Sequence, residues 1–398
     1  MSDRGNTDGA TRRRVKATGP TPTAGASPGI ANGVNLRHAS VASASKPPRR
    51  RKASSYPRRT WTIPLAIILG FFFLYALNPT ESNVVHRFLF LSYKLDRNDG
   101  GPQHYAKGIW DIAYVVFFTC VLSFTREFIM YEMLQPLARL LKIQPLGKQL
   151  RFMEQMYTAV YIAFIGPLGV YCMKHSPVWY FNTAGMYEGF PHKTHTADLK
   201  FYYLFQAAFW LQQVLVMILG VEKRRKDFRE LVCHHIVTIA LIGLSYRFHF
   251  AYMGIAVYLT HDISDFFLAI SKCLNYLDSP LQGPSFALCI AVWVYLRHYI
   301  NLRILWSVLT EFKTVGPYEL DWAAEQYKCP LANVTTFSLL AALQALNLFW
   351  LYCLLRSAYK FVFKGIAKDD RSDNDEPVKI DVATHPLETA ESLTEVAT

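Results

Sequence analysis

Long apolar stretches recur along this chain between residues 61 and 358, and they limit what it can fold into. A helix that crosses a bilayer needs about 20 apolar residues, and several stretches come close to that length. The sequence therefore predicts an all-α, polytopic membrane protein with about eight transmembrane helices, seven being the alternative. The predicted spans are residues 61–78, 108–130, 153–173, 199–220, 230–247, 250–272, 285–309 and 334–358. Pro167 is expected to break the third of them.

The composition agrees with a membrane protein. Of the 398 residues, 52% are hydrophobic and 15% are aromatic, which exceeds the usual content of a soluble domain. The 7 cysteines are scattered, mostly within apolar stretches, and lack the spacing of a disulfide framework or a metal site. No cleavable signal peptide is expected, because the first apolar stretch begins only after about 60 residues.

The two ends of the chain are polar and carry too few large apolar side chains to form a core, so both are predicted to be disordered. Ser372 is followed by three acidic residues within four positions, which is the context of an acidophilic kinase, and we predict a phosphorylation there that modulates activity.

The predicted organisation has four parts. These are a basic tail over 1–60, two spans with an amphipathic interfacial helix at 82–95 within 61–148, a catalytic membrane domain over 149–365, and an acidic tail over 366–398.

Positive charge indicates the orientation in the membrane. The net charge is +12, and many of the basic residues lie in the N-terminal tail or beside alternate ends of the predicted spans. Because cytosolic loops are enriched in Lys and Arg, eight spans would place both termini in the cytosol. The same pattern explains the positive charge without a nucleic-acid partner.

Ionisable residues within two neighbouring spans indicate a functional site. His234 and His235 lie in the fifth predicted span, and His261, Asp262 and Asp265 lie in the sixth. Such groups are costly at membrane depth and normally face a protein interior or a water-filled cavity. Since His261 and Asp265 are four residues apart, they share one helix face. The alternative is that these side chains only form polar contacts between helices.

Other polar residues extend this candidate site. Thr238 and Ser245 fall on the same helical stripe as His234, and Arg297 in the seventh span needs a partner, for which a carboxylate of the site is a candidate. A basic cluster precedes the fifth span and could receive phosphate groups, or it could simply flank the span on the cytosolic side. That cluster consists of Lys223, Arg224, Arg225 and Lys226.

Three motifs resemble those of the ceramide synthases of the TLC-domain group, particularly fungal ones. They are R-R-K-D-F-R-E-L-V-C-H-H-I-V-T at 224–238, S-Y at 245–246, and H-D-I-S-D-F-F-L-A-I-S-K at 261–272. A looser resemblance covers about 150–365. It implies transfer of a fatty acyl group from acyl-CoA to a sphingoid base, dihydrosphingosine or phytosphingosine, in the endoplasmic reticulum membrane. Acyl-CoA would then be a substrate, with no further cofactor, and fungal relatives can work as dimers and with a small accessory membrane subunit.

That activity suggests a role for each ionisable residue. We expect His234 to be the reactive ring and His235 to orient it or to serve as a second base, while His261, Asp262 and Asp265 hold the ring and bind the ammonium or hydroxyl groups of the acceptor. The ring could take the amine proton, or it could accept the acyl group first and form an acyl-imidazole. The sequence does not separate these routes.

Metal catalysis is the weaker alternative for this site. Three histidines and two aspartates could ligate zinc or iron, but the repeated histidine spacings of membrane desaturases are absent, and no metal is predicted. A non-enzymatic TLC-domain protein that senses or moves lipids is the other functional class. Such a protein has no evident need for two histidines and two aspartates in this arrangement.

Two regions near the last predicted span carry further predictions. An acyl chain attached near His234 would extend away from the cytosol toward the loop at 310–330, which would then influence the accepted chain length. Asn333 is part of the sequon N-V-T, at the mouth of the last span, and is predicted to remain mostly unglycosylated.

Overall fold

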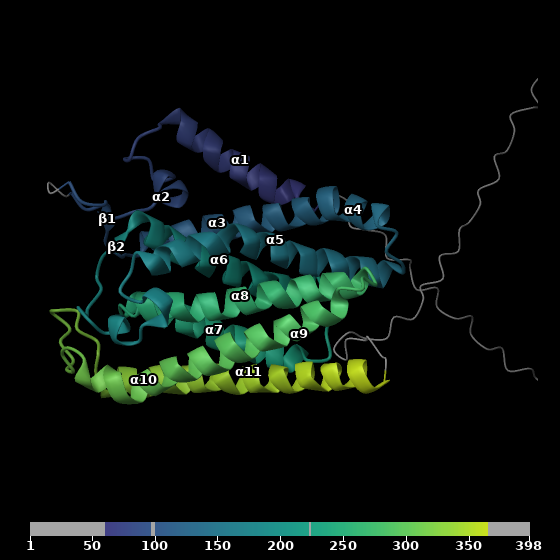
Figure 1. Ribbon diagram of the computed structural model, residues 1–398. Coiled ribbons are helices and arrows are strands. Elements are labelled where there is room, and N and C mark those ends of the chain that lie inside the picture. Colours follow the sequence, from purple (N-terminus) through teal and green to yellow (C-terminus); the bar gives the residue numbers. More distant parts are fainter. Residues whose placement is uncertain (1–59, 97–99, 223, 365–398) are drawn as a thin grey trace, which may run out of the picture. The chain divides into compact units, whose positions relative to one another are not determined.

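A computed structural model describes residues 60–96, 100–222 and 224–364 of the chain (Figure 1). The predicted disorder of the two tails, the predicted phosphorylation of Ser372 and the predicted phosphate contact of Lys223 all lie outside the described residues.

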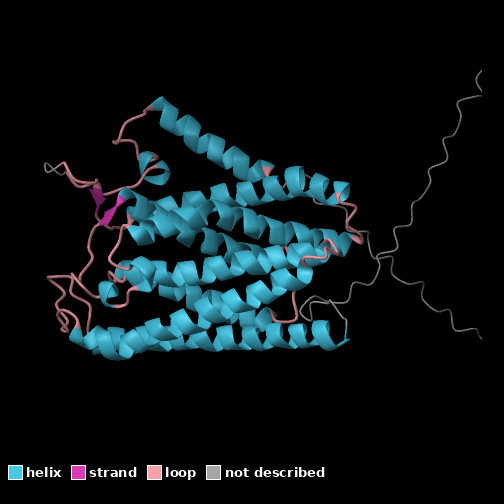
Figure 2. Ribbon diagram, in the orientation of Figure 1, coloured by secondary structure: helices cyan, strands magenta, loops and turns pink. Residues whose placement is uncertain are grey.

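Helices make up almost all of the regular structure in these ranges, and the two short strands lie together (Figure 2). The helices are α1 Thr62–Leu77, α2 His86–Leu89, α3 Trp110–Phe128, α4 Gln135–Leu140, α5 Leu146–Lys174, α6 Ala197–Leu219, α7 Phe228–Arg247, α8 Ala251–Tyr276, α9 Gln282–Trp293, α10 Asn301–Thr314 and α11 Pro330–Lys364. Strands β1 His104–Tyr105 and β2 His195–Thr196 are antiparallel, with His104 opposite Thr196.

Two π-helical segments join neighbouring helices into longer rods. The segment Ile129–Leu134 connects α3 to α4, and Val294–Ile300 connects α9 to α10. Such segments are frequent at functional sites, and the second one carries Arg297.

Seven helical stretches of the described chain are long and apolar enough to cross a membrane. They are Trp110–Leu140, Leu146–Lys174, Ala197–Leu219, Phe228–Arg247, Ala251–Tyr276, Gln282–Thr314 and Pro330–Lys364. Helix α1 is also apolar, but its 16 residues extend only about 24 Å at 1.5 Å per residue, against a hydrocarbon thickness of roughly 30 Å. The prediction of an all-α polytopic membrane protein is confirmed, with seven full-length candidates and one shorter apolar helix.

Two predictions about individual segments were wrong. The third span is not broken at Pro167, because α5 continues through that residue from Leu146 to Lys174. Missing backbone hydrogen bonds at proline are tolerated in membrane helices, where neighbouring helices supply other partners. The interfacial helix predicted at 82–95 is reduced to the four residues of α2. After α2 the chain is not helical, and Lys94 forms an antiparallel β-bridge with Tyr105.

The loops gather at two ends of the helices (Figure 1). One end, here called the sheet end, holds β1, β2, the α7–α8 turn and residues 315–329; contacts of His249 with His192 and Glu325 tie these loops together. The other, here called the basic end, holds residues 141–145, 220–222, 224–227 and 277–281, and Lys148 pairs there with Asp278 at 2.7 Å. Successive long helices therefore run in opposite directions.

Helix α8 lies at the centre of the packing that positions the site. It contacts α5, α7, α9 and α10, and it is the most buried of the seven candidate spans, at 56%. Close approach to α6 depends on Gly254, since a side chain there would collide with the ring of Tyr203. The ionisable residues of α8 consequently face other helices rather than lipid.

Candidate active site

The α7–α8 hairpin brings the two predicted groups of ionisable residues to the same level. The turn at 248–250 is tight, with His249 at φ +68°. The His249 side chain is held there by Lys107, whose Nζ lies 3.0 Å from His249 Nδ1. Counting 1.5 Å per residue from His249, His234 is about 22 Å away along α7. On α8, His261 and Asp265 are about 18 and 24 Å away. All three therefore lie at similar depth.

A polar cavity of about 230 Å³ opens between α5, α6, α7, α8 and the first half of the α9–α10 rod. It unites seven of the predicted site residues, which are His234, His235, Asp262, Asp265, Arg297, Arg224 and Arg225. The two arginines belong to the segment just before α7, so the cavity extends toward the basic end.

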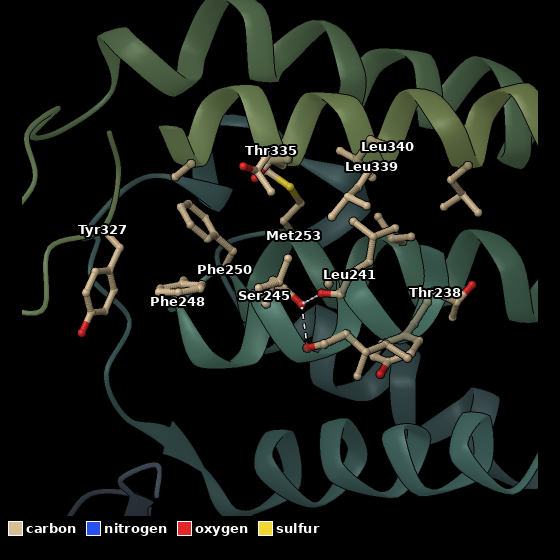
Figure 3. Close-up of a pocket in the computed structure, with 18 of the residues that line it drawn as sticks. Thr238, Leu241, Ser245, Phe248, Phe250, Met253, Tyr327, Thr335, Leu339 and Leu340 are labelled. Carbon is tan, nitrogen blue, oxygen red and sulfur yellow. Dashed lines mark hydrogen bonds between the residues drawn. The ribbon is translucent and has the colours of Figure 1, made fainter. Parts of the chain in front are cut away.

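A second cavity, of about 300 Å³, is lined mainly by apolar side chains of α7, α8, α11 and residues 320–329. His234, Thr238 and Ser245 contribute from α7, as their helical spacing predicted, and His261 contributes from α8. Figure 3 shows this cavity from Thr238 at one side to Phe248, Phe250 and Tyr327 at the other. From His234 to Phe248 it follows 14 residues of α7, or about 21 Å.

His234 lies where the two cavities meet, because its side chain lines both. Its ring is buried between the indoles of Trp210 and Trp350, with ring centroids 5.6 and 5.2 Å away. Nε2 lies 3.5 Å from Thr238 Oγ1, and Nδ1 has no hydrogen-bond partner among the described residues. An imidazole so placed can take a proton from, or attack, an amphiphile whose polar head and alkyl chain occupy the two cavities.

His261 differs from His234 in that both of its ring nitrogens are engaged. Nδ1 lies 2.8 Å from the carbonyl oxygen of Val257, so it must carry the proton and donate. Nε2 is then the acceptor for the Asn347 side-chain amide, at 3.3 Å. This geometry fixes the ring rather than leaving it free to react.

The two carboxylates of α8 have separate partners. Asp262 is buried and accepts a hydrogen bond from Gln206 Nε2; the Gln206 oxygen in turn accepts from Tyr161 OH at 2.8 Å. Asp265 pairs with Arg297 at 2.6 Å. The expectation that a carboxylate of the site would pair with Arg297 is thus confirmed. No hydrogen bond joins either carboxylate to His234 within the described ranges.

The guanidinium of Arg297 is held on every side. Nε donates to Ser264 Oγ at 2.6 Å, Nη1 to Asn347 Oδ1 at 3.3 Å, and Nη2 to the His261 carbonyl at 3.2 Å. The group also stacks over the Trp293 ring, with its carbon 4.0 Å from the centroid. Buried charges require such compensation, and these contacts tie α8, the π-helical segment and α11 together.

The described basic residues before α7 differ in their surroundings. Arg225 makes two bonds to Asp227, at 2.9 and 2.7 Å, and Asp227 also accepts the Trp350 indole N–H at 3.1 Å. Arg224 is exposed and lies over the Phe228 ring, 4.9 Å from its centroid. Lys226 is exposed and lines neither cavity. Arg224 and Arg225 are therefore the described cations of this cluster that reach the polar cavity.

Sequence reasoning missed several residues that organise the site. Trp210, Trp350, Asn347 and Gln206 all contact predicted site residues. The signal available was a polar amide inside an apolar stretch, as at Asn347 and Gln206. No group of three or more His, Cys, Asp or Glu residues within the described ranges is arranged to hold a metal ion.

Comparison with known proteins finds similarity to TLC-domain proteins and to sphingosine N-acyltransferases over most of the chain. Residues 151–356 match the TLC-domain family TRAM_LAG1_CLN8. The sphingosine N-acyltransferase-like protein FUM17 of Gibberella moniliformis is 54% identical over 323 residues, 80% of this chain and 83% of that protein. Ceramide synthase LAG1 of Saccharomyces cerevisiae is 47% identical over 320 residues, 80% and 77% of the two chains. Sphingosine N-acyltransferase lac1 of Schizosaccharomyces pombe is 44% identical over 321 residues, covering 80% and 83%.

Proposed function

The chain belongs to the TLC-domain family, in the group of the sphingosine N-acyltransferases or ceramide synthases, and we propose that it joins the acyl group of a fatty acyl-CoA to the amine of a sphingoid base within a membrane. The products are a ceramide or dihydroceramide and free CoA. Acyl-CoA is a substrate, and no additional cofactor enters the reaction.

The position of His234 between the polar and the apolar cavity supports this proposal most strongly. In an acyl-CoA, the thioester carbon joins a highly charged head to an alkyl chain. With the chain in the apolar cavity and the head toward the basic end, that carbon lies beside the His234 ring. Arg224 and Arg225 are suitably placed for the phosphates of the head.

The reaction replaces the C–S bond of the thioester with a C–N bond. In one route His234 attacks the carbonyl carbon, CoA leaves as a thiolate, and the amine then displaces the ring from the acyl-imidazole. In the other, the amine attacks directly while His234 takes its proton, which then passes to the departing thiolate. Both routes use the same ring, and the absence of a carboxylate bonded to it within the described chain favours the first.

The remaining predicted residues divide into two roles. Asp265 is the more accessible carboxylate, with 30% of its side chain exposed, and we propose that it binds the ammonium group of the sphingoid base. His235 lines the polar cavity beside His234 and can receive the proton that this ammonium releases. His261 and Asp262 position α8 against α11 and α6 through Asn347 and Gln206.

The basic end is the face from which acyl-CoA arrives in this proposal, and by the distribution of Lys and Arg it is cytosolic. Location in the endoplasmic reticulum follows the family, as does assembly into dimers or with a small accessory subunit. If α1 crosses the membrane, both termini are cytosolic. A lipid-sensing protein would need the apolar cavity but not the ionisable residues beside it.

Replacing His234 with alanine tests the proposal. The purified protein should form ceramide from acyl-CoA and dihydrosphingosine, measured by mass spectrometry, and the variant should lose at least about a thousandfold in kcat, as for removal of a reacting group. Cys233→Ser is the matched control, because Cys233 is the neighbouring residue but is exposed. Turnover retained by a well-inserted His234→Ala protein would refute the assignment.

A single-turnover experiment without acceptor separates the two routes. An acyl-imidazole requires release of one equivalent of CoA per active site, together with an acylated protein detectable by mass. The direct route requires no CoA release until the sphingoid base is added.

A further inference from the structure

The polar cavity contains two amide side chains that acyl transfer itself does not use. Gln155 of α5 and Gln213 of α6 line it together with His234, and both are only partly exposed. Neither amide has a hydrogen-bond partner among the residues that the structure describes. Both amides are therefore free to bind polar groups of a ligand that enters the cavity.

A third uncharged group lies on the same wall. Thr158 is three residues after Gln155 and also lines the cavity. Its hydroxyl donates to the Glu154 carbonyl at 3.1 Å, which leaves its oxygen able to accept. The wall made by α5 and α6 therefore presents these neutral donors and acceptors together with the Glu154 carboxylate, which pairs with Arg151 at 2.9 Å. The opposite side presents the ion pair of Asp265 and Arg297.

Depth along the helices places Gln213 at the level of the reacting ring. Gln213 is six residues before the end of α6 at Leu219, and His234 is six residues after the start of α7 at Phe228. Each is thus about 9 Å into its helix from the basic end. Because α6 and α7 are consecutive, antiparallel and in contact, Gln213 and His234 lie at similar depth.

The chemistry of this wall selects among the parts of the two substrates. CoA phosphates would be bound by cations, and an alkyl chain would be bound by apolar side chains. A sphingoid base is a 2-amino-1,3-diol, in which the C1 and C3 hydroxyls flank the reacting amine and can both donate and accept. We propose that Gln155 and Gln213, assisted by Thr158, bind these two hydroxyls and so turn the amine toward His234. This inference rests on the proposed acyltransferase function.

The test compares two acceptors at saturating acyl-CoA, dihydrosphingosine and its 1-deoxy analogue. A site that bonds a substrate hydroxyl rejects the analogue that lacks it. In the double variant Gln155→Leu/Gln213→Leu, kcat/KM for dihydrosphingosine should fall at least about tenfold, and that for the 1-deoxy analogue should fall less. The preference for the hydroxylated acceptor should therefore decrease, while the KM for acyl-CoA stays unchanged.

Two controls keep the result interpretable. Gln282→Leu makes the same chemical change on α9 at a glutamine that does not line the polar cavity, and it should leave both acceptors unaffected. If the double variant does not fold, the single variants Gln155→Met and Gln213→Met keep the side-chain length and should each lower the preference.

Failure of this inference is distinguishable from failure of the proposed function. If the wild-type protein makes no ceramide, the function itself is wrong. If the wild-type protein is active and the folded variants keep its full preference for dihydrosphingosine over the 1-deoxy analogue, the hydroxyl assignment is wrong and the function stands.

Discussion

Replacing Leu339 with tryptophan should shorten the acyl chain that the protein accepts. Leu339 of α11 lines the apolar cavity, and Figure 3 shows it on the α11 side, facing the α7 residue Leu241. Measured along α11 from Trp350, which packs on His234, Leu339 is 11 residues away and Thr335 is 15 residues away. These separations correspond to about 16 and 22 Å.

A tryptophan at 339 would therefore block at least the roughly 6 Å of the cavity between Leu339 and Thr335. A carbon–carbon bond of about 1.5 Å with an angle near 111° advances an extended chain by about 1.25 Å per carbon. The blocked length then corresponds to about five methylene groups. At about 0.8 kcal/mol for each methylene, the longest chains would lose up to about 4 kcal/mol, or roughly a thousandfold in kcat/KM relative to chains about five carbons shorter.

The assay is the ceramide profile made from an equimolar mixture of acyl-CoAs of different length. Leu348→Trp is the matched control, because Leu348 lies on the same helix but is 55% exposed on its outer face. The control should keep the wild-type profile, and Leu339→Trp should move it to shorter products at similar total turnover. An active Leu339→Trp protein with an unchanged profile would show that the acyl chain does not occupy this cavity.

Further predictions concern four separate parts of the chain. Exchanging residues 310–330 for the loop of a relative with different chain selectivity should shift product length, since four residues of this loop line the apolar cavity; an unchanged ceramide profile from an active chimera would contradict this. Arg297→Met should lower the free energy of unfolding by up to about 3 kcal/mol by leaving the partly exposed Asp265 carboxylate without its ion-pair partner, and adding Asp265→Asn should restore part of it; strictly additive effects in thermal unfolding would disprove the coupling. Burial, reinforced by nearby positive charge, lowers the pKa of Lys107 from 10.5 to about 7. As the pH rises, the folded protein therefore loses this proton before the unfolded chain does. Burial of the charged Lys107 side chain destabilises the fold fully below pH 7. The free energy of unfolding should therefore rise from pH 7 toward pH 10.5 by up to about 1.4 kcal/mol per pH unit, and melting curves of Lys107→Met should lack this rise. Asn333 is 8% exposed and its side-chain amide donates to an α10 carbonyl at 2.6 Å, so glycosidase treatment should cause no mobility shift; a shift lost in Asn333→Gln would overturn the prediction.

The membrane class, most span positions and the α7–α8 hairpin were predictable because each depends on residues close together in the sequence. An apolar stretch of about 20 residues has few alternatives to a spanning helix. Helical spacing likewise placed His234, Thr238 and Ser245 on one face, and all three line the apolar cavity. Where a local preference competes with packing, as at Pro167, the prediction was wrong.

The pairing of the site residues was decided only by the tertiary structure. Sequence motifs gathered His234, His261, Asp262 and Asp265 into one candidate site, but the partners of α8 come from elsewhere in the chain. Asn347 is 86 residues from His261 and Gln206 is 56 residues from Asp262. Chain separation of that size carries no spacing signal, since it is the packing of α6 and α11 on α8 that brings these side chains within hydrogen-bonding distance. The sequence by itself thus determined which residues are costly to bury. The fold determined which partners compensate them, and it placed the ring of His234, whose Nδ1 has no partner within the described residues, where the two cavities meet.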